Sequence, residues 1–269
     1  MKRTVGDLIR EWRKQREISQ IDLALRADVS TRHLSFVETG RSAPSRAMVL
    51  RLAERLDVPL RERNRLLLAA GYAPEFAEGA LDTPRLSLVR AAIRRVLTGH
   101  EPYPALVVDG GWDLVEANSG VAVLLEGAPE DLLAPPFNVL RYSLHPRGLA
   151  ARMVNLAQWR DHVLIRLERQ MRAAGDSRLV GLHRELAAYP ATNDLVDHED
   201  GVDPDAADVL MPVRILHDGH ELSLFSTVTT FGTPRDITVE ELHVENFYPA
   251  DAATEKYLRS GGTGRLGPI

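Results

Sequence analysis

The stretch from Ser19 to Gly40 restricts the fold of this 269-residue chain more than any other. Ser19 is of a type that caps helices, and Leu23 and Ala27 give the residues after it one apolar face. Ser30 then ends a short polar turn and is itself a helix-capping residue. The pattern therefore predicts two short helices joined by a tight turn.

The second of these helices is predicted over residues 31–39, and its residues separate by face. Leu34 and Val37 lie three apart and face inward. The side chains left on the outer face are those of Thr31, Arg32, Ser35 and Phe36. In helix-turn-helix proteins the N-terminal end of the second helix enters the major groove of DNA, while the first helix crosses the backbone. The outer side chains are therefore candidates for contact with base edges.

The order of motifs resembles a known family. Ser-Gln-x-x-Leu-Ala, Val-Ser, Leu-x-x-Val-Glu-x-Gly-Arg and Pro-Ser, spread over residues 4–72, are similar to the XRE (Cro/repressor-type) helix-turn-helix family. The string Arg32–Ser42, together with Leu66–Pro74, resembles a narrower subfamily with a C-terminal MmyB-like ligand-binding domain. The resemblance implies an all-α, five-helix, lambda-repressor-like domain, with an ion pair between Arg13 and Glu38.

Arg32 is the residue expected to read a base, because a guanidinium can bridge two acceptors on guanine. The alternative is a phosphate contact, which would position the protein without reading sequence. Thr31, Ser35 and Phe36 are expected to meet a thymine methyl or a neighbouring base edge. The expected phosphate contacts are Gln20, Ser30, Thr39, Arg41 and Ser45, whereas His33 either donates to a phosphate or only covers a flank of the helix.

Charge is distributed unevenly along the chain. Residues 1–80 contain 15 Lys and Arg against 11 Asp and Glu, a net charge of +4. Residues 81–269 contain 18 against 27, a net charge of −9. Because neutralising DNA phosphates strengthens binding, only the first part is expected to touch DNA.

The chain is long enough for two domains. We predict a DNA-binding domain over residues 1–78, a linker at 79–84, a ligand-binding and dimerisation domain over 85–255, and a flexible tail over 256–269. A helix predicted at 85–98 would pack on both domains and couple them.

The second domain is predicted to be α+β. Two early strands are followed by Asn118 and a short helix, an order of elements that resembles a PAS domain. Asp218-Gly219 suits a two-residue hairpin turn between later strands. The further predicted elements are helices at 149–174 and 176–188, a mobile acidic loop at 190–208, and strands at 209–217, 221–231 and 236–247. These strands predict an antiparallel PAS-like sheet of about five strands, a fold that usually encloses a small molecule.

The segment Asn138–Pro146, followed by Asn155 and Trp159, resembles the ligand-binding domain of the same subfamily. That resemblance implies an apolar, fatty-acid-like effector in a PAS-like pocket, with no other cofactor required. The predicted ligand contacts are Trp112, Asn118, Arg141, His145 and Trp159. For the two tryptophans the alternative is an ordinary place in the core, and for Asn118 it is a helix cap.

Other chemistry finds little support in the sequence. The absence of cysteine excludes disulfides and thiol nucleophiles, and neither a phosphate-binding glycine loop nor a nucleophile elbow is present. We predict no catalytic residue and no metal site, because His217, His220 and His243 lack further ligands at a recognisable spacing. The ligand pattern of a cupin is also missing. With neither a signal peptide nor a run of about 20 apolar residues, the protein is expected in the cytoplasm.

Together these features predict a bacterial transcription regulator rather than an enzyme. It would bind a pseudo-palindromic operator in double-stranded DNA as a homodimer, as a repressor whose affinity responds to the effector. Two alternatives stay open at this point: the second domain binds a protein partner, or it is an enzyme whose helix-turn-helix regulates its own gene.

Overall fold

The computed structural model describes residues 3–174, 177–193, 195 and 211–261. Their contacts divide the chain into two compact units. One contains the chain up to Gly79, with short segments around residues 172–174 and 233–240. The other contains most of the remaining described residues.

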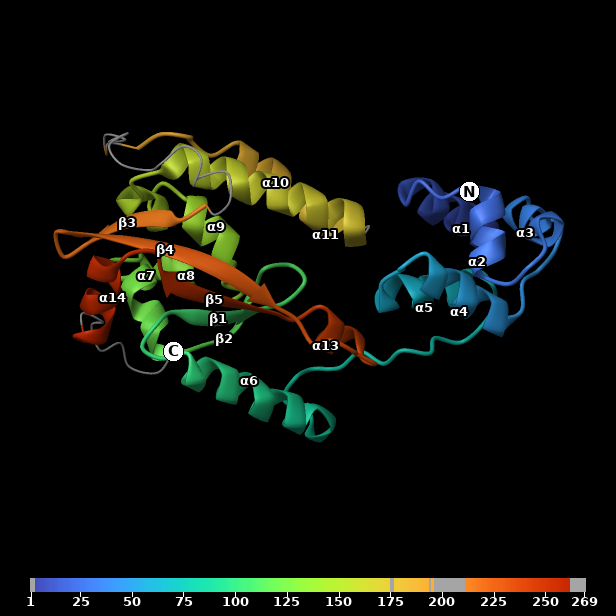
Figure 1. Ribbon diagram of the computed structural model, residues 1–269, viewed down its shortest axis with the longest axis horizontal. Coiled ribbons are helices and arrows are strands. Elements are labelled where there is room, and N and C mark those ends of the chain that lie inside the picture. The colour runs from blue at the N-terminus through green and yellow to red at the C-terminus, as the bar shows by residue number, and fades with distance from the viewer. Residues whose placement is uncertain (1–2, 175–176, 194, 196–210, 262–269) are drawn as a thin grey trace. The chain divides into compact units, whose positions relative to one another are not determined.

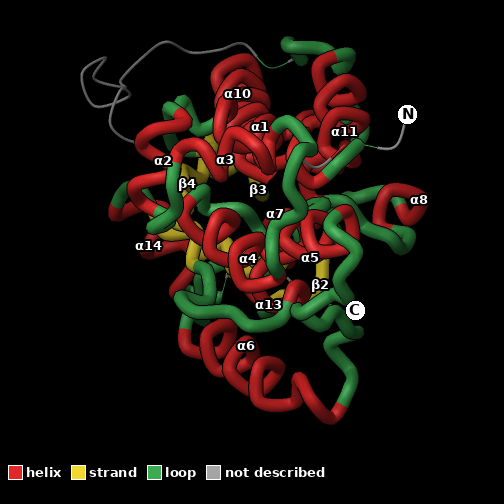
Figure 2. The backbone as a smooth tube through the Cα atoms, turned by 90° about the vertical axis from the view of Figure 1, so that its right-hand side faces the viewer, coloured by secondary structure: helices red, strands yellow, loops and turns green. Residues whose placement is uncertain are grey.

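The first unit is built around five helices, as the sequence predicts. They are α1 (Val5–Gln15), α2 (Gln20–Arg26), α3 (Thr31–Glu38), α4 (Arg46–Arg55) and α5 (Leu60–Ala69). Figure 2, in which helices are red, shows them following one another with short loops between. Their inward faces form one apolar core that includes Ile9, Leu23, Leu34 and Leu52.

Local signals in the sequence produce the turn between α2 and α3. The hydroxyl oxygen of Ser19 accepts a hydrogen bond from the backbone N–H of Asp22 at 3.1 Å, and that of Ser30 accepts one from His33 at 3.1 Å. Asp28 adopts a positive φ of 51°, which reverses the chain between the two caps. The helix-turn-helix therefore forms where its capping residues place it.

Gly6 allows α1 to pack closely on α3. A Cβ atom at this position would lie 2.2 Å from the backbone carbonyl oxygen of Val37. Gly6→Ala is therefore expected to force the two helices apart and to cost about 1–3 kcal/mol of unfolding free energy. Urea denaturation checks this, with Gly79→Ala as the control because a Cβ there meets nothing within 4 Å. Equal stability of the two variants would contradict the prediction.

The second unit contains a five-stranded antiparallel sheet. Its strands are β1 (Ala105–Val108), β2 (Leu114–Ala117), β3 (Val213–His217), β4 (His220–Thr229) and β5 (His243–Pro249), in the order β2-β1-β5-β4-β3. Figure 1 shows the two longest strands, β4 and β5, side by side. β5 is the central strand and pairs with both β1 and β4. The sheet confirms the predicted α+β class.

Helices cover both faces of this sheet. The helical elements that follow α5 in the chain are η1 (Pro84–Leu86), α6 (Ser87–Gly99), η2 (Ser119–Val121), α7 (Ala122–Leu125), α8 (Glu130–Leu133), α9 (Val139–Leu144), η3 (Leu149–Arg152), α10 (Leu156–Ala174), α11 (Ser177–Ala187), α13 (Ile237–Glu240) and α14 (Ala252–Arg259), of which α13 belongs to the first unit. On one face, Ile93 and Leu97 of α6 pack on Val107 and Val244. On the other, a larger core joins α7, α9, η3, α10 and α11 to the sheet.

Two predicted elements differ in extent because of contacts made far along the chain. The helix predicted from 149 is interrupted before α10, since the backbone N–H of Val154 donates to the carbonyl of Arg214 at 2.7 Å. The strand predicted over 236–247 begins only at His243, because the Asp236 carboxylate accepts from the N–H of Thr238 and starts α13.

The predicted start of the C-terminal tail, residue 256, is too early. Helix α14 is capped by the Asp251 side chain and extends to Arg259, with Leu258 fully buried. On α6, the apolar side chains of Leu88 and Val96 are exposed. Most of the acidic loop predicted at 190–208 lies outside the described residues, as does the end of the tail.

Candidate functional site

The outer face of α3 presents the residues predicted to meet bases. Thr31, Arg32 and His33 are exposed, and Ser35 and Phe36 are half-buried. The guanidinium carbon of Arg32 lies 5.4 Å from the centre of the Phe36 ring, and that of Arg41 lies 5.9 Å from it. The ring therefore attracts both cations to the same exposed surface.

Several predicted phosphate contacts also have local partners. Ser30 and Ser45 cap α3 and α4, and the Thr39 hydroxyl donates to the carbonyl of Ser35 at 2.7 Å. Gln20 donates from its side-chain amide to the Glu38 carboxylate at 3.0 Å. A serine oxygen that accepts a hydrogen bond from a backbone N–H keeps its own hydroxyl hydrogen to donate to a phosphate. The phosphate contacts of all these residues stay predictions.

The ion pair implied by the family resemblance is present and holds the end of α3. Arg13 donates from Nε to one oxygen of Glu38 at 2.7 Å and from Nη2 to the other at 2.9 Å. Arg10 also contacts the Glu38 carboxylate, at 3.6 Å, and its backbone carbonyl. The hydrogen bond that Arg13 donates to Glu38 raises the pKa of Arg13 above its ordinary value. The carboxylate thus joins α1, α2 and α3 at one buried point.

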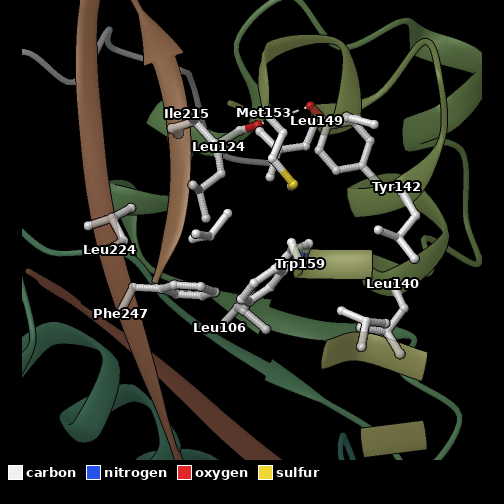
Figure 3. Packing of buried hydrophobic residues seen from close by; sticks show 14 of the residues in the cluster. Leu106, Leu124, Leu140, Tyr142, Leu149, Met153, Trp159, Ile215, Leu224 and Phe247 are labelled. Atoms are coloured by element: carbon white, nitrogen blue, oxygen red, sulfur yellow. Dashed lines mark hydrogen bonds between the residues drawn. The ribbon is translucent and has the colours of Figure 1, made fainter. Parts of the chain in front are cut away.

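An apolar cavity lies between the sheet and the helices of the larger core in the second unit. Its apolar lining consists of Leu106, Leu114, Val121, Leu124, Leu125, Phe137, Val139, Leu140, Tyr142, Leu149, Trp159, Val213 and Phe247. Figure 3 shows Phe247 of β5 and Trp159 of α10 pointing toward one another among these side chains. The cavity volume is about 60 Å³.

One ion pair supplies the charge of this cavity lining. Arg166 of α10 donates from Nη1 to a carboxylate oxygen of Glu245 on β5 at 2.8 Å. Ser226 of β4 donates its hydroxyl to the same oxygen at 3.0 Å. The guanidinium carbon of Arg166 also lies 4.4 Å from the centre of the Trp112 ring. Arg166 is therefore held by an ion pair and by an aromatic face.

Two buried nitrogens of the second unit have no hydrogen-bond partner. They are Nε1 of Trp159, which lines the cavity, and Nδ1 of His243, whose ring stacks on Trp112. Burial lowers the pKa of His243, as it does that of His162 on α10, and the nearby charge of Arg166 lowers both further. Neither imidazole is therefore expected to carry a charge near pH 7.

The structure places the five predicted ligand residues at different sites. Trp159 lines the cavity. Trp112 does not line it but packs on Arg166, which does. Asn118 instead ties β1 to the preceding loop: its Oδ1 accepts from the N–H of Ala105 at 2.9 Å, and its Nδ2 donates to the carbonyl of Tyr103 at 2.8 Å. It makes no helix-capping hydrogen bond from its side chain.

Arg141 and His145 belong to a polar cluster outside the cavity lining. Arg141 donates to both carboxylate oxygens of Glu185, at 2.6 and 3.0 Å, which joins α9 to α11. Tyr189 donates to the same carboxylate at 2.7 Å, and its ring meets that of His145 edge to face. Burial, together with Glu185, raises the pKa of Tyr189 to about 12. Arg141 is therefore already engaged by a carboxylate of the protein.

The Arg141–Glu185 pair predicts a pH dependence. Arg141 holds the pKa of Glu185 below its ordinary value, so the stabilisation is complete above that value and is lost as the pH falls through the lowered pKa. Because both side chains are more than a third exposed, we expect at most about 1 kcal/mol. Thermal unfolding of Glu185→Gln and of the unmodified protein should differ at pH 7 and converge in acid. A constant difference across that range would contradict the assignment.

The three histidines considered for metal binding lie in two places. His217 and His220 both contact the ring of Tyr257, whereas His243 stacks on Trp112. Among the described residues, ligand atoms of Glu126, His217 and Asp218 lie within 4.8 Å of one another. However, Glu126 faces Nε2 of His217 at 3.0 Å and Asp218 faces Nδ1 at 3.9 Å. The two carboxylates therefore do not converge on one ring nitrogen.

Sequence reasoning did not identify Arg166 and Glu245. A signal was present in each case. Arg166 follows Trp159 by seven residues and Val163 by three, which places a charge beside the apolar face of a helix. Glu245 lies two residues before the apolar Phe247, so the two side chains share one face of the strand. A charge on a buried face requires a partner, but its identity depends on the fold.

A helix-turn-helix unit and an α+β unit that encloses an apolar cavity, present in one chain, define a DNA-binding transcription regulator with a ligand-binding domain. A family model of the MmyB-like transcription regulator ligand binding domain matches residues 89–260, and a helix-turn-helix model matches residues 9–63. Because the first match covers most of the chain, the protein belongs to the family of regulators with an MmyB-like ligand-binding domain.

Other comparisons add little. No curated protein is significantly similar in sequence. A solved structure titled "Structure of an RNA-binding Light-Oxygen-Voltage Receptor" matches 97% of this chain with 14% identity and a TM-score of 0.25. This chain covers 62% of the length of that one. In the part of the chain that the structure describes, no helix has the length and apolar character needed to cross a membrane.

Proposed function

We propose that the protein is a repressor that binds a pseudo-palindromic operator as a homodimer, and that an apolar, fatty-acyl-like effector in the second unit changes its affinity for DNA. The observation that carries the effector part is the cavity, whose walls are apolar except for a few polar groups. Such a lining suits a ligand that is mostly hydrocarbon. The domain content is that of a regulator rather than an enzyme.

The dimer is proposed from the size of α3. This helix has eight residues, and its N-terminal part is the part expected in the groove. One such helix reads only half of a typical operator. A twofold dimer would place two reading helices about 34 Å apart on successive major grooves. Light scattering of the purified protein checks this, and a monomer at the concentration that saturates the operator would contradict it.

The small volume of the cavity implies that effector binding changes the domain. About 60 Å³ is less than the roughly 150 Å³ of an engineered apolar cavity that accepts benzene. A longer ligand must therefore displace side chains or helices around the cavity, in particular α9, η3 and α10. Binding energy spent on that displacement favours one conformation of the domain over another.

Helix α6 is our candidate for transmitting this change. It packs on the face of the sheet opposite the cavity, through Ile93 and Leu97, and it lies shortly after the end of the first unit in the sequence. Widening the cavity would shift the sheet on which α6 rests. We propose that this shift alters the spacing of the two reading helices.

The test is an operator titration with and without effector. A genomic footprint supplies the operator, and mass spectrometry of protein purified under native conditions supplies the bound molecule. We expect saturating effector to change operator affinity by about 5- to 150-fold, the usual range of allosteric coupling. Identical affinities would remove the proposed regulation but leave DNA binding intact. A reporter under the operator would give the sign of the regulation.

The limited cavity volume also favours a second candidate, in which this domain binds a protein partner instead of a metabolite. That candidate expects no small molecule in native mass spectrometry. It also expects a variant filled at the cavity, such as Val121→Leu, to repress normally and to respond to the same signal. Loss of the response in this variant, with repression retained, would support the effector.

A further inference from the structure

The charges at the cavity already balance. Among the described residues that line it, Arg166 and Glu245 are the only ones whose side chains are charged near pH 7, since burial raises the pKa of Tyr142 above its ordinary value, and they pair with each other at 2.8 Å. The Glu245 side chain is only 6% exposed and that of Arg166 22%. The pair is therefore shielded from water. An additional charge in such a buried place is costly.

The charge of Arg166 is already matched within the protein. Its guanidinium is paired with Glu245 and lies over the ring of Trp112 at 4.4 Å. His162 and His243, which both interact with Arg166, have lowered pKa values and stay neutral near pH 7. A ligand carboxylate would therefore bring a second negative charge into the cavity in addition to that of Glu245. Only one cation, Arg166, is present to balance the two. One of the two would remain buried without a counter-charge.

The lining does offer an unused hydrogen-bond donor. Nε1 of Trp159 is buried and has no acceptor, although indole N–H groups usually find one when buried. Tyr142 donates its hydroxyl to the carbonyl of Leu124 and Ser143 donates to that of Leu140, so neither donor is free. An oxygen on the ligand would satisfy the indole without bringing in a charge.

From these observations we infer that the effector is an uncharged apolar molecule with an oxygen acceptor, such as an ester, and that the cavity rejects the corresponding free carboxylate. The inference rests on the proposed effector function and gives that effector a chemical class. It assigns Glu245 the role of excluding anions by occupying Arg166.

The experiment compares ligands that differ in charge but share a carbon chain. Calorimetric titration of the full-length protein at pH 7.5 would use the methyl esters and the sodium salts of butanoic, hexanoic, octanoic and decanoic acids. At the chain length that binds best, we expect the ester to bind at least about tenfold more tightly than the carboxylate, since the latter leaves a buried charge unpaired.

Two variants separate charge from shape. Glu245→Gln keeps the size of the side chain and its hydrogen bond from Ser226 but releases Arg166. It should bind the carboxylate at least about tenfold more tightly than the unmodified protein does, with ester affinity changed less than about threefold. The matched control, Arg166→Gln with Glu245→Gln, removes both charges and should reject the carboxylate again. Thermal unfolding of each variant first establishes that it is folded.

The outcomes distinguish the inference from the function on which it rests. If the unmodified protein binds the carboxylate as tightly as the ester, the inference is wrong, while the apolar effector site stands. The same conclusion follows if Glu245→Gln folds but gains no affinity for the carboxylate. If no ester and no salt binds at any chain length, the proposed effector function fails, and the inference fails with it.

Discussion

Glu38→Ala is expected to remove about 3–5 kcal/mol from the stability of the first unit, because it leaves Arg13 partly buried without its counter-charge. Glu38 is almost fully buried, with a side chain only 2% exposed, and it accepts hydrogen bonds from Arg13 and Gln20. Hydrogen exchange of the backbone amides in α1 and α3 reports this unit separately from the second. Both helices should lose protection together in the variant.

Two further variants test the cause of that loss. Glu38→Gln keeps the shape and part of the hydrogen bonding, so its effect should be intermediate. Gln20→Ala removes one neutral donor to the charged carboxylate and should cost about 1.5–3 kcal/mol. If Glu38→Ala leaves amide protection in α3 unchanged, the carboxylate does not hold the reading helix.

Arg32→Ala is expected to lower operator affinity by about 1–3 kcal/mol for each half-site, the energy with which a bidentate contact distinguishes guanine from other bases. In the proposed dimer both half-sites lose the contact. Affinity for random DNA should fall much less, since phosphate contacts supply most of it. Titration of operator and random DNA at two salt concentrations measures both quantities.

Arg41 is the matched control, because it is a second arginine that lies close to the same Phe36 ring. It is expected to contact a phosphate, so Arg41→Ala should weaken binding to operator and random DNA alike and reduce the salt dependence by about one charge. If Arg32→Ala shows this same uniform loss, Arg32 contacts a phosphate and another residue reads the base.

The first unit could be predicted closely from sequence because its signals are local. Ser19, Ser30 and Ser45 each cap the helix that follows, and the predicted inward residues are those that are buried. The family resemblance added the Arg13–Glu38 pair, which local patterns do not indicate. The participation of Arg10 and Gln20 in that cluster was missed, because it depends on how α1, α2 and α3 approach one another.

The fold class and the number of strands of the second unit were predicted, but the limits of its helices and the ion pair at its cavity were not. The break before α10 depends on a hydrogen bond to the carbonyl of Arg214, and the extent of α14 depends on the burial of Leu258. Neither contact can be predicted from the residues nearby in the sequence. The pair at the cavity joins residues 79 positions apart. Trp159, which was predicted to contact the ligand or otherwise to have an ordinary place in the core, lines the cavity. Its role in ligand binding, like the predicted DNA contacts, stays a prediction.

The central position of β5 has a consequence for how the protein is made. β1 with β2, and β3 with β4, form antiparallel pairs between neighbouring strands of the chain, but the two pairs are connected only through β5. This strand begins at His243, so the sheet can close only after a ribosome has synthesised all five strands. Until then the growing chain holds two separate hairpins with unpaired edges, which makes the interval before β5 emerges the stage at which this domain is most exposed to aggregation.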